Sequence, residues 1–594
     1  MDERGRKRIS QIIAVVVGIV AIVAIRNPPW SSEGGTTSGI LPDPGNCVNL
    51  SVTASSEKAA LLTQMADSFN RSGETTDGRC IYVTVNKKAS GEAMTALARG
   101  WNDRIDGPRP DVWSPASSSW VGLLRQRLAA SDQTGLVPVD IPTIAYSPLV
   151  IAMPRTMAQA LEWPDKPLGW SDIYRLATDP AGWASEGHPE WGPFKLGKTN
   201  PNYSTSGLHA LIGSYYAATG LTSDLSLKDV ASPKAQAFVK GVESSVYHYG
   251  DISLTFLANM QAADDRGEGL SYVSAVAIEE KSVWDYNQGN PSGDPATVGQ
   301  HAPPSEPLVA IYPKEGTLVS DHPFVVLDAP WADPTKDDAA ARFLAFLQAP
   351  AQQQTFQSYA FRAFDGTPGE RIKSANGLLP DQPKKVLVPP PPEVLDAVLA
   401  SWADLRKRAR VTLLIDTSGS MDSSGGEGKS KLELAKEAAT KALAQFAPDD
   451  EVSLWAFSDD SCRQIVSMGP VSQGMDALRS GIGSLRADGD TPLYECVRTV
   501  VDQMHIDYAS DRINGVIVLS DGMNSVASNG DDCLDCLKEY LSSELGVRVF
   551  PIAYGGDADL DVLKQIAAAS RAAAYDASDP TSIDKVFVSV ISNF

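Results

Sequence analysis

Three oxygen-bearing side chains stand at every second position at the end of a largely apolar run. Asp416, Ser418 and Ser420 follow residues 411–415, which read VTLLI. This pattern predicts a buried parallel strand that brings polar groups to its carboxyl end, where α/β sheets bind ligands. One carboxylate and two hydroxyls are hard oxygen donors, which suit Mg²⁺, Mn²⁺ or Ca²⁺ better than zinc or copper. The spacing indicates a divalent-cation site, and the alternative is a polar cluster that holds no ion.

Two downstream residues extend this pattern. Thr491 lies in a loop rich in glycine and aspartate, and Asp521 ends the apolar run of residues 515–520. The resulting order is D-x-S-x-S, then a loop threonine, then S-D-G. It resembles the metal-ion-dependent adhesion site of the von Willebrand factor A (VWA) family over residues 410–594. The resemblance implies a Rossmann-like, doubly wound and mostly parallel sheet.

The same resemblance implies roles for the five side chains. Ser418, Ser420 and Thr491 would contact the ion, and Asp416 and Asp521 would act directly or through water. Mg²⁺ or Mn²⁺ is expected, with Ca²⁺ as the alternative. In the VWA family the open coordination position accepts an acidic residue of a partner protein, so we expect a protein partner here.

Composition limits the other partners. The chain has 594 residues, which exceeds the size of one hydrophobic core and predicts two or more domains. Its formal net charge is −22. Nucleic acid is therefore not expected as a partner, since an acidic chain without a basic stripe repels phosphate.

The N-terminal segment can enter a membrane. Residues 9–25 carry no charge and follow Arg4, Arg6, Lys7 and Arg8. The basic cluster predicts a cytoplasmic tail at residues 1–8, a signal-anchor at 9–26 and a flexible linker at 27–46. A single-pass cell-membrane protein with an extracellular C-terminal bulk follows. A cleavable signal peptide is the rival interpretation, although no clear A-x-A site follows the run.

Strands and helices alternate after the linker. This α/β pattern resembles the type II periplasmic solute-binding proteins over residues 47–377. The first lobe is expected at about 47–148 and 307–377, and the second at about 149–306. Residues 378–409 then form a proline-rich connector and a helix whose apolar stripe needs a partner.

Six hydroxyl residues are candidate solute contacts, because they stand where strands lead into helices. Free backbone N–H groups there favour anionic or strongly polar ligands. The alternative is that they are ordinary helix caps. These candidates are Ser55, Ser56, Ser90, Ser204, Thr205 and Ser206.

Six cysteines agree with an oxidising compartment. We expect the pairs Cys47–Cys80, Cys462–Cys496 and Cys533–Cys536. The first is expected because the other four cysteines belong to another domain. The alternative is that Cys462 or Cys496 pairs with the helix of Cys533, because connectivity does not follow from sequence alone.

Three classes of function can be compared. Enzymatic activity is not expected, since the sequence has neither a G-x-S-x-G elbow nor an H-E-x-x-H pair. A solute receptor of an ABC-type uptake system fits the first domain alone. A membrane-anchored surface protein that binds a solute with one domain and grips a protein partner with the other accounts for both domains.

Overall fold

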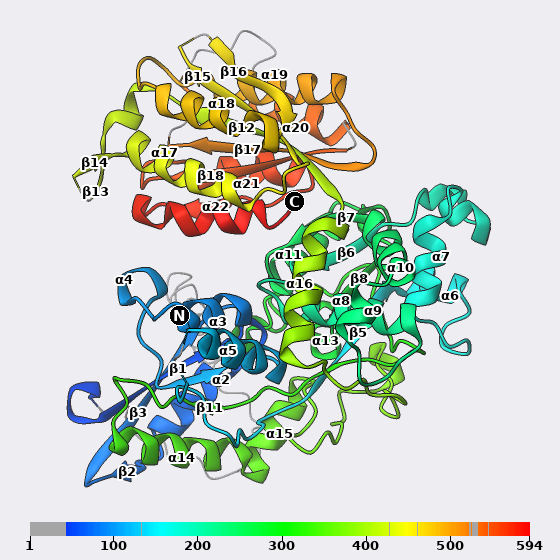
Figure 1. The fold of residues 1–594 in the computed structure, drawn as a ribbon, viewed down its shortest axis with the longest axis vertical. Coiled ribbons are helices and arrows are strands. Elements are labelled where there is room, and N and C mark those ends of the chain that lie inside the picture. The colour runs from blue at the N-terminus through cyan, green and yellow to red at the C-terminus, as the bar shows by residue number, and fades with distance from the viewer. Residues whose placement is uncertain are drawn as a thin grey trace, which may run out of the picture.

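The computed structural model describes residues 43–131, 134–426, 428–459, 461–521, 524–525, 533–543 and 546–594. The expected membrane segment at 9–26 lies outside these residues. Within the described ranges no helix has the length and apolar character that a bilayer crossing requires. Figure 1 shows a two-lobed body with a further α/β domain above it.

The first lobe is built on β1 (Val48–Ala54), whose alternate residues are buried. β3 (Arg79–Lys87) and β4 (Val112–Ser114) run parallel to it on either side. Two short antiparallel strands, β2 (Thr75–Thr76) and β11 (Val325–Val326), complete the described sheet. The other elements of this lobe are η1 (Pro44–Asn46), α2 (Ser56–Asn70), α3 (Ser90–Ala98), α4 (Asp103–Asp106), α5 (Ser118–Ala130), α14 (Pro334–Gln348) and α15 (Pro350–Ser358).

The second lobe is built on β5 (Ser147–Pro154), which is buried along its whole length. β5 pairs antiparallel with β8 (Ala275–Glu279), β9 (Leu308–Ile311) and β10 (Val319–Ser320). β9 and β10, expected from the sequence in the first lobe, therefore belong to the sheet of the second. The chain returns to the first lobe only with β11. The boundary between the lobes depends on which strands pair, and an apolar run in the sequence does not encode its pairing partner.

Parallel strands and helices complete the second lobe. β6 (Leu196–Thr199) runs parallel to both β8 and β7 (Val246–Gly250). The remaining elements are α6 (Arg155–Ala160), α7 (Trp170–Thr178), η2 (Gly182–Glu186), η3 (Pro189–Trp191), α8 (Thr205–Thr219), α9 (Leu227–Val230), α10 (Pro233–Ser244), α11 (Ser253–Asp265), α12 (Gly269–Tyr272), α13 (Glu280–Asn287), η4 (Pro295–Thr297) and η5 (Ser374–Asn376).

The connector ends in α16 (Pro392–Leu405), which joins the two parts of the molecule. Its apolar stripe packs against α5, α8, α9 and α10 of the two lobes. Trp402 meets the ring of Tyr249 edge-on, with 5.2 Å between the ring centroids. The stripe recognised in the sequence thus has its partner in the solute-binding part.

The C-terminal domain is a doubly wound α/β sheet, as expected. Its described strands follow the order β16-β15-β12-β17-β18-β19, and β16 runs antiparallel at one edge. Leu413 and Ile415 of β12 pack toward α17, α18 and α22, whereas Leu414 packs toward α19, α20 and α21. The strands are β12 (Arg408–Asp416), β13 (Ser424–Gly426), β14 (Lys429–Ser430), β15 (Glu451–Ser458), β16 (Ser461–Pro470), β17 (Arg512–Ser520), β18 (Val547–Tyr554) and β19 (Tyr575–Ala577). The helices are η6 (Gly419–Asp422), α17 (Lys431–Ala442), η7 (Leu443–Gln445), α18 (Val471–Ser484), α19 (Leu493–Ile506), α20 (Leu534–Ser543), α21 (Leu560–Ala569), η8 (Pro580–Ser582) and α22 (Ile583–Ile591).

All three expected disulfides are present. The Cα atoms lie 4.5 Å apart in Cys47–Cys80, 5.4 Å in Cys462–Cys496 and 5.1 Å in Cys533–Cys536. The second bond ties the edge strand β16 to the first turn of α19. That turn follows Thr491 directly.

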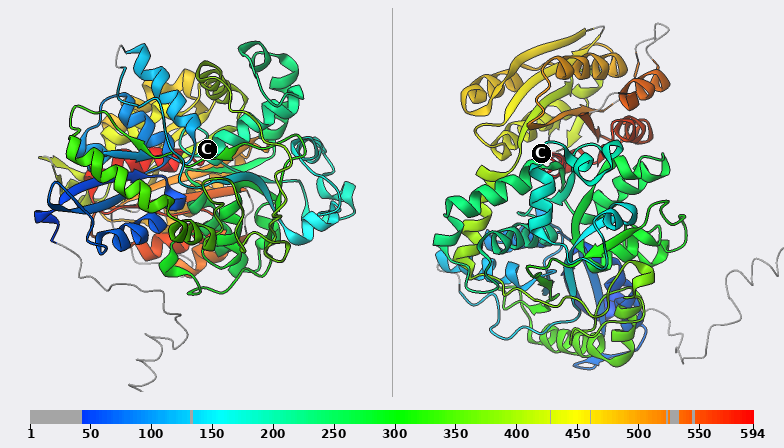
Figure 2. Two further views of the ribbon diagram at one scale, coloured as in Figure 1. Left: turned by 90° about the horizontal axis from the view of Figure 1, so that it is seen from below. Right: turned by 90° about the vertical axis from the view of Figure 1, so that its right-hand side faces the viewer.

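The C-terminal domain rests on the second lobe, and the chain terminus lies at the junction (Figure 2). The backbone N–H of Tyr249 donates to the carbonyl of Asn593 at 3.1 Å. The guanidinium of Arg571 binds both carboxylate oxygens of Glu268, at 2.8 and 3.2 Å. Polar contacts therefore help to set the position of this domain.

Candidate functional site

Asp416 ends β12 and is fully buried beneath the candidate cation site. Its Oδ1 accepts the backbone N–H of Ser418 at 2.8 Å, and its Oδ2 accepts the hydroxyl of Ser520 at 2.7 Å. Burial raises the pKa of this carboxyl to about 6. Asp416 thus orients the loop that follows it.

A chain of hydrogen bonds joins three of the other predicted residues. The hydroxyls of Ser418 and Ser420 lie 3.0 Å apart, and Ser420 donates to Oδ1 of Asp521 at 2.7 Å. Asp521 follows β17, the neighbour of β12 in the sheet, and is 1% exposed. Side chains from two adjacent strand ends therefore meet, as their parallel orientation requires.

The loop that carries Thr491 lies against the same edge. Gly419 N–H donates to the carbonyl of Gly489 at 2.9 Å, and the hydroxyl of Ser525 accepts the N–H of Thr491 at 2.8 Å. Gly489 has φ +81°, and a Cβ there would lie 1.8 Å from Oδ1 of Asp459. Only glycine fits this close approach.

Sequence reasoning missed Lys431, the first residue of α17. Its Nζ lies 2.8 Å from Oδ2 of Asp521, and its side chain is 6% exposed. Nothing in the local sequence separates this lysine from others on the helix. Ser520, the serine of the S-D-G motif, was given no role from the sequence.

The donor set fits a hard divalent cation. Two carboxylates and the hydroxyls of two serines gather at one end of the sheet, with a threonine loop beside them. Lys431 compensates one of the two negative charges. Ser420 is the exposed member of this cluster.

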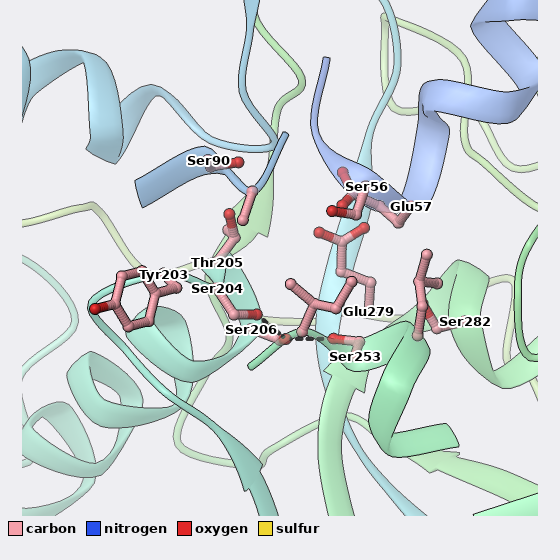
Figure 3. A pocket seen from close by; sticks show the side chains of 13 residues that line it. Ser56, Glu57, Ser90, Tyr203, Ser204, Thr205, Ser206, Ser253, Glu279 and Ser282 are labelled. Carbon is pink, nitrogen blue, oxygen red and sulfur yellow. Dashed lines mark hydrogen bonds between the residues drawn. The ribbon is translucent and has the colours of Figure 1, made fainter. Parts of the chain in front are cut away.

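A second candidate site lies in the two-lobed part. Five of the six predicted hydroxyl residues, all except Ser55, line one cavity between the lobes (Figure 3). The hydroxyl of Ser206 lies 3.1 Å from that of Ser204 and 2.7 Å from that of Ser253. Thr205 accepts a hydrogen bond from Trp120 at 2.8 Å.

Ser55 is not among the residues that line the cavity. Its hydroxyl donates to Glu57 and accepts from the ammonium of Lys58. Ser90 accepts the backbone N–H of Ala116 at 3.0 Å. Ser55 and Ser204 stand at the N-cap positions of α2 and α8, yet neither side chain makes a capping hydrogen bond.

The two lobes are closed on one another. Gly91 N–H donates to the carbonyl of Tyr203 at 3.0 Å, and a Cβ on Gly91 would lie 2.1 Å from the carbonyl oxygen of Asn202. Nε2 of His209 in the second lobe lies 3.1 Å from the hydroxyl of Ser117 in the first. The cavity is therefore enclosed by direct contacts between the lobes.

Two carboxylates in this cavity were not predicted as contacts. Glu57 stands in the first turn of α2, and Glu279 ends β8. In the sequence, the signal for a contact role of these two residues is their position, at a helix start and at a strand end. Tyr272 and Trp284, which flank Glu279 in the sequence, are buried in the core of the second lobe.

Comparison with known families agrees with this architecture. A family model described as bacterial extracellular solute-binding protein matches residues 50–362, more than half of the 594 residues. The chain belongs to this family. A second family model, described as von Willebrand factor type A domain, matches residues 411–524 of this solute-binding protein. The recognition of both domains from the sequence is thereby confirmed.

Individual relatives of this solute-binding protein are distant. Uncharacterized proteins from two strains of Mycobacterium tuberculosis are each 24% identical over 575 residues, covering 93% of this chain and 79% of theirs. A periplasmic binding protein from Actinobacillus pleuropneumoniae, with fructose-6-phosphate bound, superposes with a TM-score of 0.39 at 15% identity, covering 61% of this chain and 99% of that one. A von Willebrand factor type A protein from Catenulispora acidiphila gives a TM-score of 0.27 at 20% identity, covering 32% of this chain and 42% of that one.

Proposed function

We propose that this solute-binding protein is a membrane-anchored extracellular binding protein without catalytic activity. Its VWA domain binds a protein partner through a divalent cation, and its cleft binds a small solute. The observation that carries the proposal is the hydrogen-bonded chain Ser418–Ser420–Asp521 above the buried Asp416. It gathers hard oxygen donors from neighbouring strand ends at one edge of the sheet.

Ser418, Ser420 and Thr491 would hold Mg²⁺ or Mn²⁺, with Ca²⁺ as the alternative. Asp416 positions Ser418 through its backbone, and Asp521 positions Ser420 through its hydroxyl. A bound ion supplies an open coordination position for a carboxylate of the partner. The exposed side of Ser420 leaves that position accessible to another protein.

Calorimetry with MgCl₂ tests the cation site. The parent protein should bind one Mg²⁺ and Asp416→Ala should bind none, because the loop loses the carboxylate that orients Ser418. Asp561→Ala is the matched control, since that carboxylate lies in the same domain with its side chain 87% exposed. Equal Mg²⁺ affinity in Asp416→Ala and the parent would refute the assignment.

The membrane anchor is proposed from the uncharged run at 9–25 and the basic residues before it. An epitope placed after Phe594 should be digested when protease is added to intact cells. Digestion only after lysis would show the opposite orientation.

A solute receptor of an ABC-type uptake system is the second candidate, favoured by the closed two-lobed cleft. Genes for a permease and an ATPase next to the gene of this protein would favour the uptake role. Deletion of those genes should then abolish uptake of the solute that the cleft binds. Unchanged uptake would favour the anchored sensor instead.

A further inference from the structure

Two carboxylates from opposite lobes face one another in the cleft. Glu57 comes from α2 of the first lobe and Glu279 from β8 of the second, and both line the inner cavity (Figure 3). No lysine or arginine is among the described residues that line it. The cavity is therefore lined by two carboxyl groups, with the ammonium of Lys58 4.0 Å from Oε1 of Glu57, and burial raises the pKa of Glu279 to about 7.

Two buried polar atoms at this cavity have no hydrogen-bond partner among the described residues. Glu279 is 4% exposed, and its Oε1 accepts from Ser320 at 2.8 Å while its Oε2 is unpaired. The hydroxyl of Ser282, which is 1% exposed, is also unpaired. Buried polar groups are nearly always hydrogen-bonded, so these atoms indicate a donor in the cavity, either a water or a group of a ligand.

The neighbouring His322 argues against a metal ion. Its Nδ1 lies 3.3 Å from the ammonium of Lys58, which can only donate a hydrogen bond. Nδ1 therefore accepts, and the ring proton is on Nε2, 3.6 Å from Oε2 of Glu279. A protonated Nε2 cannot ligate a metal, and the positive charge of Lys58 would repel a divalent ion more than a monovalent one.

The space suits an ammonium group. The inner cavity holds about 20 Å³, which is room for one water-sized group. A primary ammonium has this size and carries three donors, which match the acceptors of Glu57, Glu279 and Ser282.

An outer cavity of about 410 Å³ adjoins the inner one. It shares Ser56, Ala89, Tyr203 and Ile252 with the inner cavity. Its far wall includes Val588 and its neighbours on α22 of the VWA domain. This volume is typical of a small-molecule site and can take the body of a solute.

We propose that the cleft binds a small organic solute through a protonated primary amino group held between Glu57 and Glu279. The remainder of the solute occupies the outer cavity beneath α22. This inference rests on the proposed function, in which the cleft binds a solute, and adds the chemical class of that solute.

The first experiment analyses the full chain purified under native conditions. Small molecules released by denaturation are treated with dansyl chloride, which labels primary amines, and identified by mass spectrometry. A dansylated solute supports the inference. A released solute without an amine overturns the inference and leaves solute binding intact.

The second experiment uses three probes of equal length but different charge: putrescine, 1,4-butanediol and succinate. Calorimetry at pH 7 should show putrescine binding at least tenfold more tightly than either of the others. Glu279→Gln, which keeps the side-chain shape, should weaken putrescine at least tenfold. Glu162→Gln in the same lobe, with its side chain 72% exposed, should not change it.

The outcomes separate the two proposals. Preferred binding of the diol or the diacid, unaffected by Glu279→Gln, overturns the amine assignment alone. If no probe binds and no solute is released from the native protein, both solute binding and the amine assignment are overturned. Ser282→Ala serves as a second variant and should weaken putrescine about threefold without lowering the Tm.

Discussion

The ammonium of Lys431 lies 2.8 Å from Oδ2 of Asp521, at the inner side of the proposed cation site. Both side chains are buried, at 6% and 0% exposure. The other oxygen of Asp521 accepts from Ser420. Lys431 therefore neutralises a carboxylate that would otherwise face a bound cation with its full charge.

Replacing Lys431 by methionine should lower the stability of the domain and raise its affinity for the cation. Without Mg²⁺ the variant should unfold about 3 kcal/mol more easily, because Asp521 is left as an unpaired buried charge. Its Mg²⁺ affinity should rise roughly tenfold, since a repelling charge is removed. Thermal unfolding with EDTA or MgCl₂, together with calorimetry, measures both quantities.

Lys441→Met is the control for this change, since Lys441 lies on the same helix and pairs with Asp584 at the surface. Its stability should change by less than about 0.5 kcal/mol and its Mg²⁺ affinity not at all. Weaker Mg²⁺ binding in Lys431→Met would contradict the neutralising role.

The disulfide Cys462–Cys496 should stabilise both the domain and the cation site. Replacing both cysteines by serine should lower stability by about 3 kcal/mol, because the bond closes a sequence separation of 34 residues. Mg²⁺ affinity should fall about threefold, because the turn next to Thr491 loses its tie to β16. Urea unfolding and calorimetry measure the two effects.

The serine double variant of Cys533 and Cys536 is the matched control. That bond spans a separation of three residues, so its loss should change stability little and Mg²⁺ affinity not at all. Equal loss of Mg²⁺ affinity in both double variants would argue against a local role for Cys462–Cys496.

The pair Arg571–Glu268 should contribute to docking of the VWA domain on the second lobe. A double-mutant cycle with alanine at both positions should give a coupling energy of about 1–2 kcal/mol, because the contact is bidentate and partly buried. The urea midpoints of the parent, the single variants and the double variant supply the cycle. A coupling near zero, as expected for the exposed pair Lys538–Asp535, would mean that other contacts hold the domains together.

The stability of the solute-binding part should fall with acidification through His209. Burial lowers the pKa of His209 to about 3 from its ordinary value of 6.5, so the imidazole is neutral in the fold and gains a proton on unfolding. Stability is therefore lost as pH falls from 6.5 toward 3, by up to about 1.4 kcal/mol per pH unit.

His209→Gln should reduce this pH dependence, measured as the difference in urea midpoint between about pH 7.5 and about pH 5. His301→Gln, with its side chain 42% exposed, should retain the parent slope. The same slope in His209→Gln and the parent would show that other groups cause the acid sensitivity.

Much of the fold followed from local patterns. The apolar run before Asp416, the alternation of strands with helices and the stripe of α16 each depend on neighbouring residues. Since parallel strands end at the same edge of a sheet, the sequence alone was enough to expect Asp416 and Asp521 close together. Each domain has an even number of cysteines, which pointed to Cys47–Cys80, whereas the pairing of the other four was decided by the tertiary structure.

Tertiary structure decided the contacts between distant segments. Glu57 and Glu279 share a cavity only because the lobes close, and Lys431 reaches Asp521 only because α17 begins beside the end of β17. The assignment of β9 to the second lobe likewise depends on its pairing with β5. Local sequence determines which residues form a strand or helix, but the order of strands and the closure of lobes arise from packing among segments far apart in the chain.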